Sequence, residues 1–108
     1  MITYKLNKPI SLLNGKEIDE LNLDYDALTL SDLRTANKIV GMIGESTIGN
    51  IDNGSLSPRL DPNLRTAIAF VAAIKGTPGL RVDDVLKVSM VDALCLGEDC
   101  LSNYLFRW

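Results

Sequence analysis

The sequence predicts an α+β fold in which an N-terminal antiparallel β-hairpin is followed by a bundle of three to four α-helices. Two observations lead to this prediction. Apolar residues alternate along the first part of the chain, which is the periodicity of a strand with one buried face. Beyond about residue 30 they recur at helical spacing, in segments separated by glycine, proline and serine. We expect residues 1–108 to form a single domain.

The predicted hairpin covers about residues 2–24. In its first strand the large apolar residues stand at even positions, whereas Pro9 falls on the opposite phase and cannot donate to a strand ladder. A three-residue loop, Leu13-Asn14-Gly15 with Gly15 in the left-handed conformation, pairs Ile10 with Ile18 and keeps apolar side chains together. A two-residue Asn-Gly loop would mix the two faces, so the sequence favours the longer loop.

The second strand needs an irregularity to bury all of its apolar residues. Ile18 is out of phase with Leu21 and Leu23, so a regular strand would place it on the opposite face. A β-bulge near Asp19-Glu20 would absorb one residue and bring the three onto one face. Because an isolated hairpin is marginal in water, we expect helices or a neighbouring subunit to cover that face.

Helices are predicted over about 31–43, 62–75, 82–88 and 89–105. Ser31 is the expected N-cap of the first, whose buried stripe would be Leu33, Ala36, Val40 and Ile43. Asp61-Pro62 starts the second, and Ser89 caps the last. The last helix is expected to bury Met90, Leu94, Gly97, Leu101 and Leu105, with Asp92, Asp99 and Asn103 on its opposite side. Gly97 on the buried stripe indicates close approach of another element.

Two segments leave alternatives open. The helix over 62–75 is apolar nearly all round, so it is either central in the fold or covered by a partner that would contact Phe70 and Ala73. The C-terminal residues Tyr104, Leu105, Phe106 and Trp108 either complete the core or form an interface, where aromatic residues are enriched. Residues of about 44–60, rich in glycine, serine and asparagine, are predicted to be a mobile loop.

The composition argues against several classes of protein. Because the chain has no histidine, it lacks the commonest general base, and we expect no catalytic site, metal site or cofactor. A net charge of −3 without a basic stripe argues against nucleic acid as a partner. No signal peptide or membrane-spanning run is recognisable. Cys95 and Cys100 lie five residues apart in a predicted helix and point to different sides, so we expect reduced, buried thiols.

The order of the motifs carries a family resemblance. The hairpin pattern around Pro9-Ile10-x-Leu12 and Gly15-x-x-Ile18-x-x-Leu21-x-Leu23 leads into Leu30-Ser31-Asp32-Leu33. A later segment reads Val82-x-x-Val85-Leu86-x-Val88-x-x-x-Asp92-Ala93 and continues to Leu101-x-x-Tyr104-Leu105. In these features the chain resembles the tail assembly chaperone family of contractile-tailed phages and prophages, over all but the 44–60 segment.

The resemblance implies a protein that is not an enzyme and acts in the cytoplasm of the bacterial host. Such a chaperone binds the tape measure protein, protects its apolar surface, helps to recruit tail tube protein and is absent from the mature virion. A homo-oligomer is compatible with this role. The alternative is a structural subunit that is retained in a phage tail or a phage-derived particle.

Overall fold

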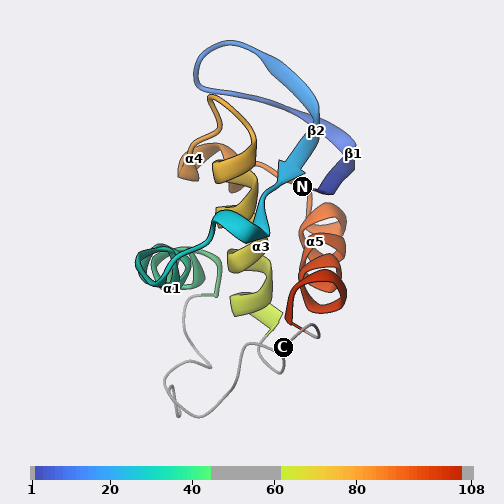
Figure 1. The fold of residues 1–108 in the computed structure, drawn as a ribbon. Coiled ribbons are helices and arrows are strands. Elements are labelled where there is room, and N and C mark those ends of the chain that lie inside the picture. Colours follow the sequence, from blue (N-terminus) through green and yellow to red (C-terminus); the bar gives the residue numbers. More distant parts are fainter. Residues whose placement is uncertain (1, 45–61, 106–108) are drawn as a thin grey trace.

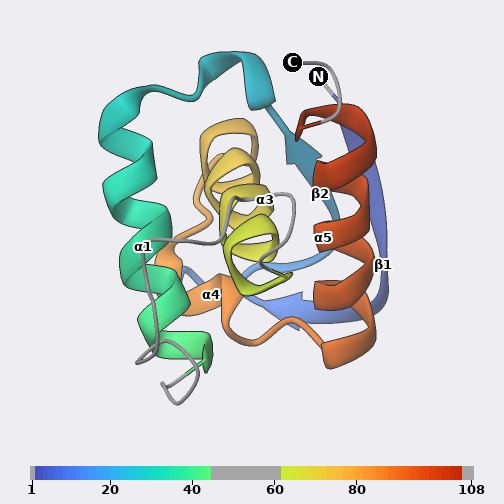
Figure 2. The ribbon, with the colours of Figure 1, turned by 90° about the horizontal axis from the view of Figure 1, so that it is seen from below.

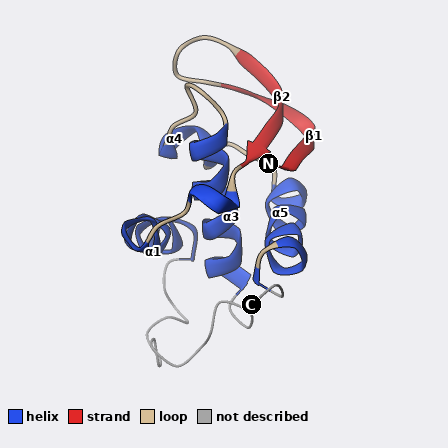
Figure 3. Cartoon of the chain, viewed as in Figure 1, coloured by secondary structure: helices blue, strands red, loops and turns tan. Residues whose placement is uncertain are grey.

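The computed structural model describes residues 2–44 and 62–105 and has the predicted α+β arrangement (Figure 1). A two-stranded antiparallel hairpin lies at one end of the molecule, and the helices extend from it (Figure 3). The elements are β1 (Ile2–Ser11), β2 (Glu17–Leu23), a short 3₁₀ helix η1 (Tyr25–Ala27), α1 (Leu30–Gly44), α3 (Pro62–Gly76), α4 (Val82–Val85) and α5 (Met90–Asn103). The predicted loop of 44–60 and the Asp61 cap lie outside the described residues, apart from Gly44, which ends α1.

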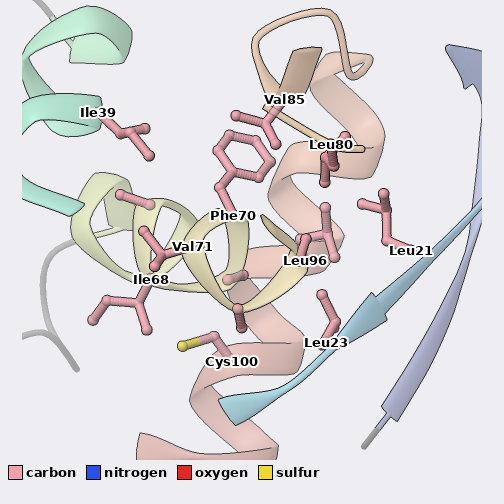
Figure 4. Close-up of a cluster of buried hydrophobic side chains, with 14 of the residues drawn as sticks. Leu21, Leu23, Ile39, Ile68, Phe70, Val71, Leu80, Val85, Leu96 and Cys100 are labelled. Carbon is pink, nitrogen blue, oxygen red and sulfur yellow. The ribbon is translucent and has the colours of Figure 1, made fainter. Parts of the chain in front are cut away.

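Helix α3 is the centre of the fold. It stands between α1 and α5 and also contacts β2 (Figure 2). Its residues from Thr66 to Ala73 are all buried, because neighbouring elements cover it on several sides. Figure 4 shows Phe70 and Val71 of α3 among side chains from β2, α1, α4 and α5. The central interpretation of this helix is therefore confirmed.

The turn of the hairpin has the predicted geometry. Ile10 pairs with Ile18, as the three-residue loop requires. The backbone N–H of Leu12 donates to the Lys16 carbonyl at 2.7 Å and closes the loop. Gly15 has φ of 92°, which glycine adopts without the steric cost that a side chain would bring.

The ladder irregularity lies at the predicted place, but its extra residues are in the first strand. Lys5 pairs with Glu20 and Ile10 with Ile18, so residues 6–9 of β1 stand opposite Asp19 alone. The expected single-residue bulge in the second strand is therefore wrong. Leu21 and Leu23 are nevertheless buried and Ile18 packs against the core, as predicted.

Asp92 explains why β1 leaves the ladder. This carboxylate is fully buried, contrary to the prediction that it lies on the outer side of the last helix. The Asn7 backbone N–H donates to both of its oxygens at 3.0 Å, and the Lys8 N–H donates to one at 3.3 Å. The Tyr4 hydroxyl donates at 2.9 Å and the Ser89 hydroxyl at 3.0 Å. Asp92 thus takes the place of a strand partner for the bulged residues.

The same contacts set the protonation of Asp92. Burial alone would raise the pKa of its carboxyl, but the hydrogen bonds from Asn7, Tyr4, Lys8 and Ser89 outweigh burial and hold the pKa below its usual value. The carboxylate is the form that accepts these hydrogen bonds, so it is the form that the fold stabilises.

Because Asp92 faces the hairpin, α5 is rotated about its axis and buries a different set of residues from the predicted stripe. Met90 and Leu94 were expected in the core, but they are 77% and 59% exposed. Leu96 and Cys100 are buried instead, whereas Cys95 is exposed, contrary to expectation. The Ser89 cap is confirmed, since its side chain accepts from the Asp92 backbone N–H.

Gly97 lies where α5 comes closest to α3, as predicted. A Cβ atom on Gly97 would stand 2.6 Å from the Thr66 hydroxyl oxygen. That hydroxyl donates to the Ala93 carbonyl at 3.3 Å, which ties the two helices together. The glycine is therefore a packing requirement of the α3–α5 contact.

A second buried carboxylate, Asp84, holds the tip of the hairpin. It accepts from the Leu13 backbone N–H and from the Arg81 N–H, each at 3.0 Å. Lys87 lies 3.5 Å from it and donates to the Ser11 carbonyl at 2.8 Å. Helix α4 is shorter than predicted, because the regular turn around Asp84 ends at Val85.

Helix α1 begins one residue earlier than predicted and buries a different face. Thr29, rather than Ser31, precedes the first helical residue, and its N–H donates to the Asp32 carboxylate at 2.7 Å. Ala36 is buried as expected, and so is Ile39, which the prediction omitted. Leu33 and Ile43 were expected in the core but are exposed, because the helix buries the residues of its middle turns instead.

We expect Asp92→Ala to lower the free energy of unfolding by more than about 2 kcal/mol, because several buried donors lose their acceptor. Urea denaturation at pH 7 measures this loss. Asp19→Ala, an exposed site on β2, is the control and should change stability by less than about 0.5 kcal/mol. The difference in free energy of unfolding between wild type and Asp92→Ala should shrink below about pH 4. The pKa of Asp92 is lower in the folded protein than in the unfolded chain, so its carboxylate stabilises the fold at neutral pH and loses this effect when it is protonated in acid. Equal losses in the two variants would contradict the role of Asp92.

Gly97→Ala should destabilise the protein by about 1–3 kcal/mol through crowding against Thr66, although alanine is the better helix former. In a Thr66→Ala background the crowding atom is gone. The same Gly97→Ala change should then cost far less, and a double-mutant cycle from thermal or urea unfolding measures the coupling. Additive effects of the two substitutions would show that this contact does not set the helix spacing.

Candidate partner-binding groove

An apolar groove of about 510 Å³ lies between α1 and α3, with Tyr104 at one end. We call it the α1–α3 groove. Its floor is formed by the buried side chains of Ala36, Ile68 and Val71. Leu28, Leu30 and Leu33 form the wall on the α1 side, and Leu30 and Leu33 are 82% and 41% exposed. Large apolar side chains thus remain in solvent around a hollow that is already apolar.

The polar side chains in the lining are occupied by one another and by the start of α1. The Asp32 carboxylate accepts from both the N–H and the hydroxyl of Thr29, at 2.7 and 3.2 Å. It also pairs with the Lys75 ammonium at 3.0 Å. Burial alone would raise the pKa of Asp32, but the Thr29 and Lys75 contacts lower it below its usual value. These groups cap a helix and hold α1 to α3, so they are already used in the fold.

The end of the groove at Tyr104 is held by an aromatic pair. The Tyr104 and Tyr25 rings stack with centroids 5.1 Å apart and planes at 13°. The Tyr25 hydroxyl donates to the Asp99 carboxylate at 2.9 Å, and the Asn103 side-chain amide donates to its other oxygen at 2.9 Å. Burial raises the pKa of the Tyr25 hydroxyl, and the nearby Cys100 and Asp99 add to this effect. The pair is therefore neutral and fixes Tyr104 at the mouth.

The structure places the partner-binding residues predicted from the sequence in different environments. Phe70, Ala73 and Leu105 are buried in the core, which favours the core alternative over the binding surface for these three residues. Tyr104 is half-buried and lines the groove. Phe106 and Trp108 lie outside the described residues.

Sequence reasoning missed the leucines of the groove wall. Leu33 was assigned to the buried stripe of the first helix, and Leu28 and Leu30 were not considered as partner-binding residues. The available signal was their crowding: three leucines fall within six positions where the helix begins, more than one narrow stripe can bury.

A second apolar surface lies on α5. Met90, Val91 and Leu94 are exposed near its N-terminal end. Beside Leu94 is a smaller hollow of about 290 Å³, bordered by an ion pair between Arg65 and Glu98 at 3.2 Å. This surface follows from the rotation of α5 that Asp92 imposes.

Within residues 2–44 and 62–105, no group of three or more histidine, cysteine, aspartate or glutamate side chains is arranged to hold a metal ion. None of the helices in that part of the chain combines the length and the apolar character that a membrane crossing requires. Comparison of the chain with protein-family models, with curated proteins and with solved structures found no match.

Phe70→Ala should lower the free energy of unfolding by about 3–5 kcal/mol, because it opens a cavity at the centre of α3. Leu33→Ala, in the exposed wall of the groove, should cost less than about 1 kcal/mol. Urea unfolding of the two variants measures both values. A Phe70→Ala variant as stable as wild type would contradict the core assignment.

Proposed function

We propose that this chain is a tail assembly chaperone of a phage or prophage, which binds an apolar helix of the tape measure protein in the α1–α3 groove. The chain then acts without catalysis in the cytoplasm of the bacterial host, delivers its client to tail tube protein and is absent from the mature virion. Two observations support the proposal: the ordered motifs that resemble this family, and a groove that suits a helical client.

The observation that carries the proposal is the exposure of leucines around a ready-made apolar floor. Complete burial of an exposed leucine side chain contributes about 1.5–3 kcal/mol of favourable free energy. A partner that buries Leu30 and Leu33 therefore gains substantially in binding free energy. Helix-in-groove recognition uses this arrangement, in which apolar anchors at helical spacing enter a groove between helices. A tape measure protein with long helical segments would supply such anchors.

The groove is less suited to a small polar substrate. Its volume falls in the range of about 300–1,000 Å³ that is typical of ligand pockets, but such pockets also present a few convergent polar groups that orient the ligand. Here Thr29 and Asp32 are engaged with each other and with Lys75. An extended apolar partner needs no such groups.

The alternative function is a structural subunit that stays in a phage tail or phage-derived particle. The exposed apolar surface of α5 favours it, because a permanent subunit contact would cover Met90, Val91 and Leu94. Detection of the chain in purified particles would select this alternative over the chaperone.

The test is co-purification of the chain with coexpressed fragments of the tape measure protein, with tail tube protein assayed in parallel. Wild type should retain a tape measure fragment. Leu33→Asp should reduce the amount of co-purified fragment at least tenfold, because a charge would then face the apolar floor. Met42→Asp is the matched control. Met42 lies on the same helix, is 55% exposed, and stands nine residues from Leu33, which is half a turn around the helix axis. Failure of wild type to retain any fragment, or equal loss in the two variants, would overturn the proposal.

A further inference from the structure

Three acidic residues lie beside the stacked Tyr25 and Tyr104 at one end of the α1–α3 groove, outside the groove lining itself. Asp26 on η1 is exposed, and Asp24 beside η1 and Asp99 on α5 are half-buried. Burial raises the pKa of the Tyr104 hydroxyl, and the nearby Cys100 and Asp26 raise it further. The Tyr104 ring stacks on Tyr25 with centroids 5.1 Å apart, and Asp26 follows Tyr25 in η1, so Asp26 lies near the Tyr104 end of the groove. In Figure 2, η1 and the C-terminal end of α5 lie at the same end of the helical layer.

The cations recorded in ion pairs around the groove have acidic partners of their own. Lys75 pairs with Asp32 at 3.0 Å in the groove lining, and Arg65 pairs with Glu98 at 3.2 Å on the far side of α3. Among the described residues, Asp24, Asp26 and Asp99 give the Tyr104 end negative charge that none of the ion pairs neutralises. The floor beside them is apolar, and low-dielectric surroundings strengthen the field of nearby charges.

We propose that the groove selects a client helix that carries lysine or arginine beside its apolar stripe, at the end that lies against Tyr104 and Asp26. This inference rests on the proposed function and adds the chemistry of the client to it. Apolar anchors enter the hollow over Ile68 and Val71, while the flanking basic residues meet the acidic end. Charge complementarity at an interface rim fixes orientation and excludes wrongly charged partners. An acidic helix with the same stripe meets repulsion at this end.

The experiment uses the full chain and two labelled synthetic helical peptides that share one leucine stripe at i, i+3, i+4 and i+7. One peptide has lysines beside the stripe at one end, and the other has glutamates there. Fluorescence anisotropy measures Kd at 50 mM and 500 mM NaCl. Because exposed charge pairs each change Kd by about two- to fivefold, the lysine peptide should bind at least about fivefold more tightly at 50 mM. The preference should fall below about twofold at 500 mM, where these charges are screened.

Two variants locate the effect. Asp26→Lys should abolish or reverse the preference for the lysine peptide. Asp19→Lys makes the same change of charge on an exposed site of β2, about 17 Å back along the strand from Asp24, and should leave the preference within about twofold of wild type. A third variant, Leu33→Asp, should weaken the binding of both peptides together, since it alters the shared apolar wall and not the charged end.

The outcomes separate this inference from the proposed function. Tight binding of both peptides with no preference, or an equal effect of Asp26→Lys and Asp19→Lys, would overturn the inference and leave the groove in place. Failure of both peptides and of the tape measure fragments to bind would overturn the proposed function and this inference with it.

Discussion

The buried carboxylate of Asp92 is the interaction on which the rest of the fold depends. It accepts hydrogen bonds from the bulged part of β1, from Tyr4 and from the cap of its own helix. A buried anion is costly unless donors surround it, and here backbone groups that have lost their strand partner supply them. The carboxylate and the bulge therefore require each other. Their contact joins the first ten residues of the chain to its last helix.

This contact also decides which surfaces remain open. With Asp92 turned toward the hairpin, Leu96, Gly97 and Cys100 face α3, and Met90 and Leu94 face solvent. Close packing at Gly97 against Thr66 holds α5 on one side of α3. On the other side α1 is buried mainly through Ala36 and Ile39, so the leucines at its beginning overhang the floor of the α1–α3 groove. The groove is a consequence of how two helices flank a central third.

The parts of the fold that local rules control could be predicted from the sequence. The three-residue turn follows from the left-handed position of Gly15. The central place of α3 is one of the two alternatives that a helix apolar nearly all round leaves open. The strand that carries the bulge and the rotation of α5 could not be predicted in this way. Asp92 was assigned to the outer side because helical periodicity places it opposite the apolar stripe, and its donor Asn7 lies 85 residues away in the sequence. The groove was missed for a related reason: periodicity assigns Leu33 to a helix face, but only the packing of α1 against α3 shows that this face is uncovered.

The central claim is that a helical client is held in the α1–α3 groove and not on the exposed surface of α5. Amide chemical shifts of ¹⁵N-labelled protein, recorded as a tape measure fragment is added, test it most directly. The account predicts that the largest changes fall on the residues that line the groove, which are Leu28, Thr29, Leu30, Asp32, Leu33, Ala36, Ile68, Val71 and Tyr104. Largest changes at residues 90–94 of α5, with the groove amides unchanged, would contradict it.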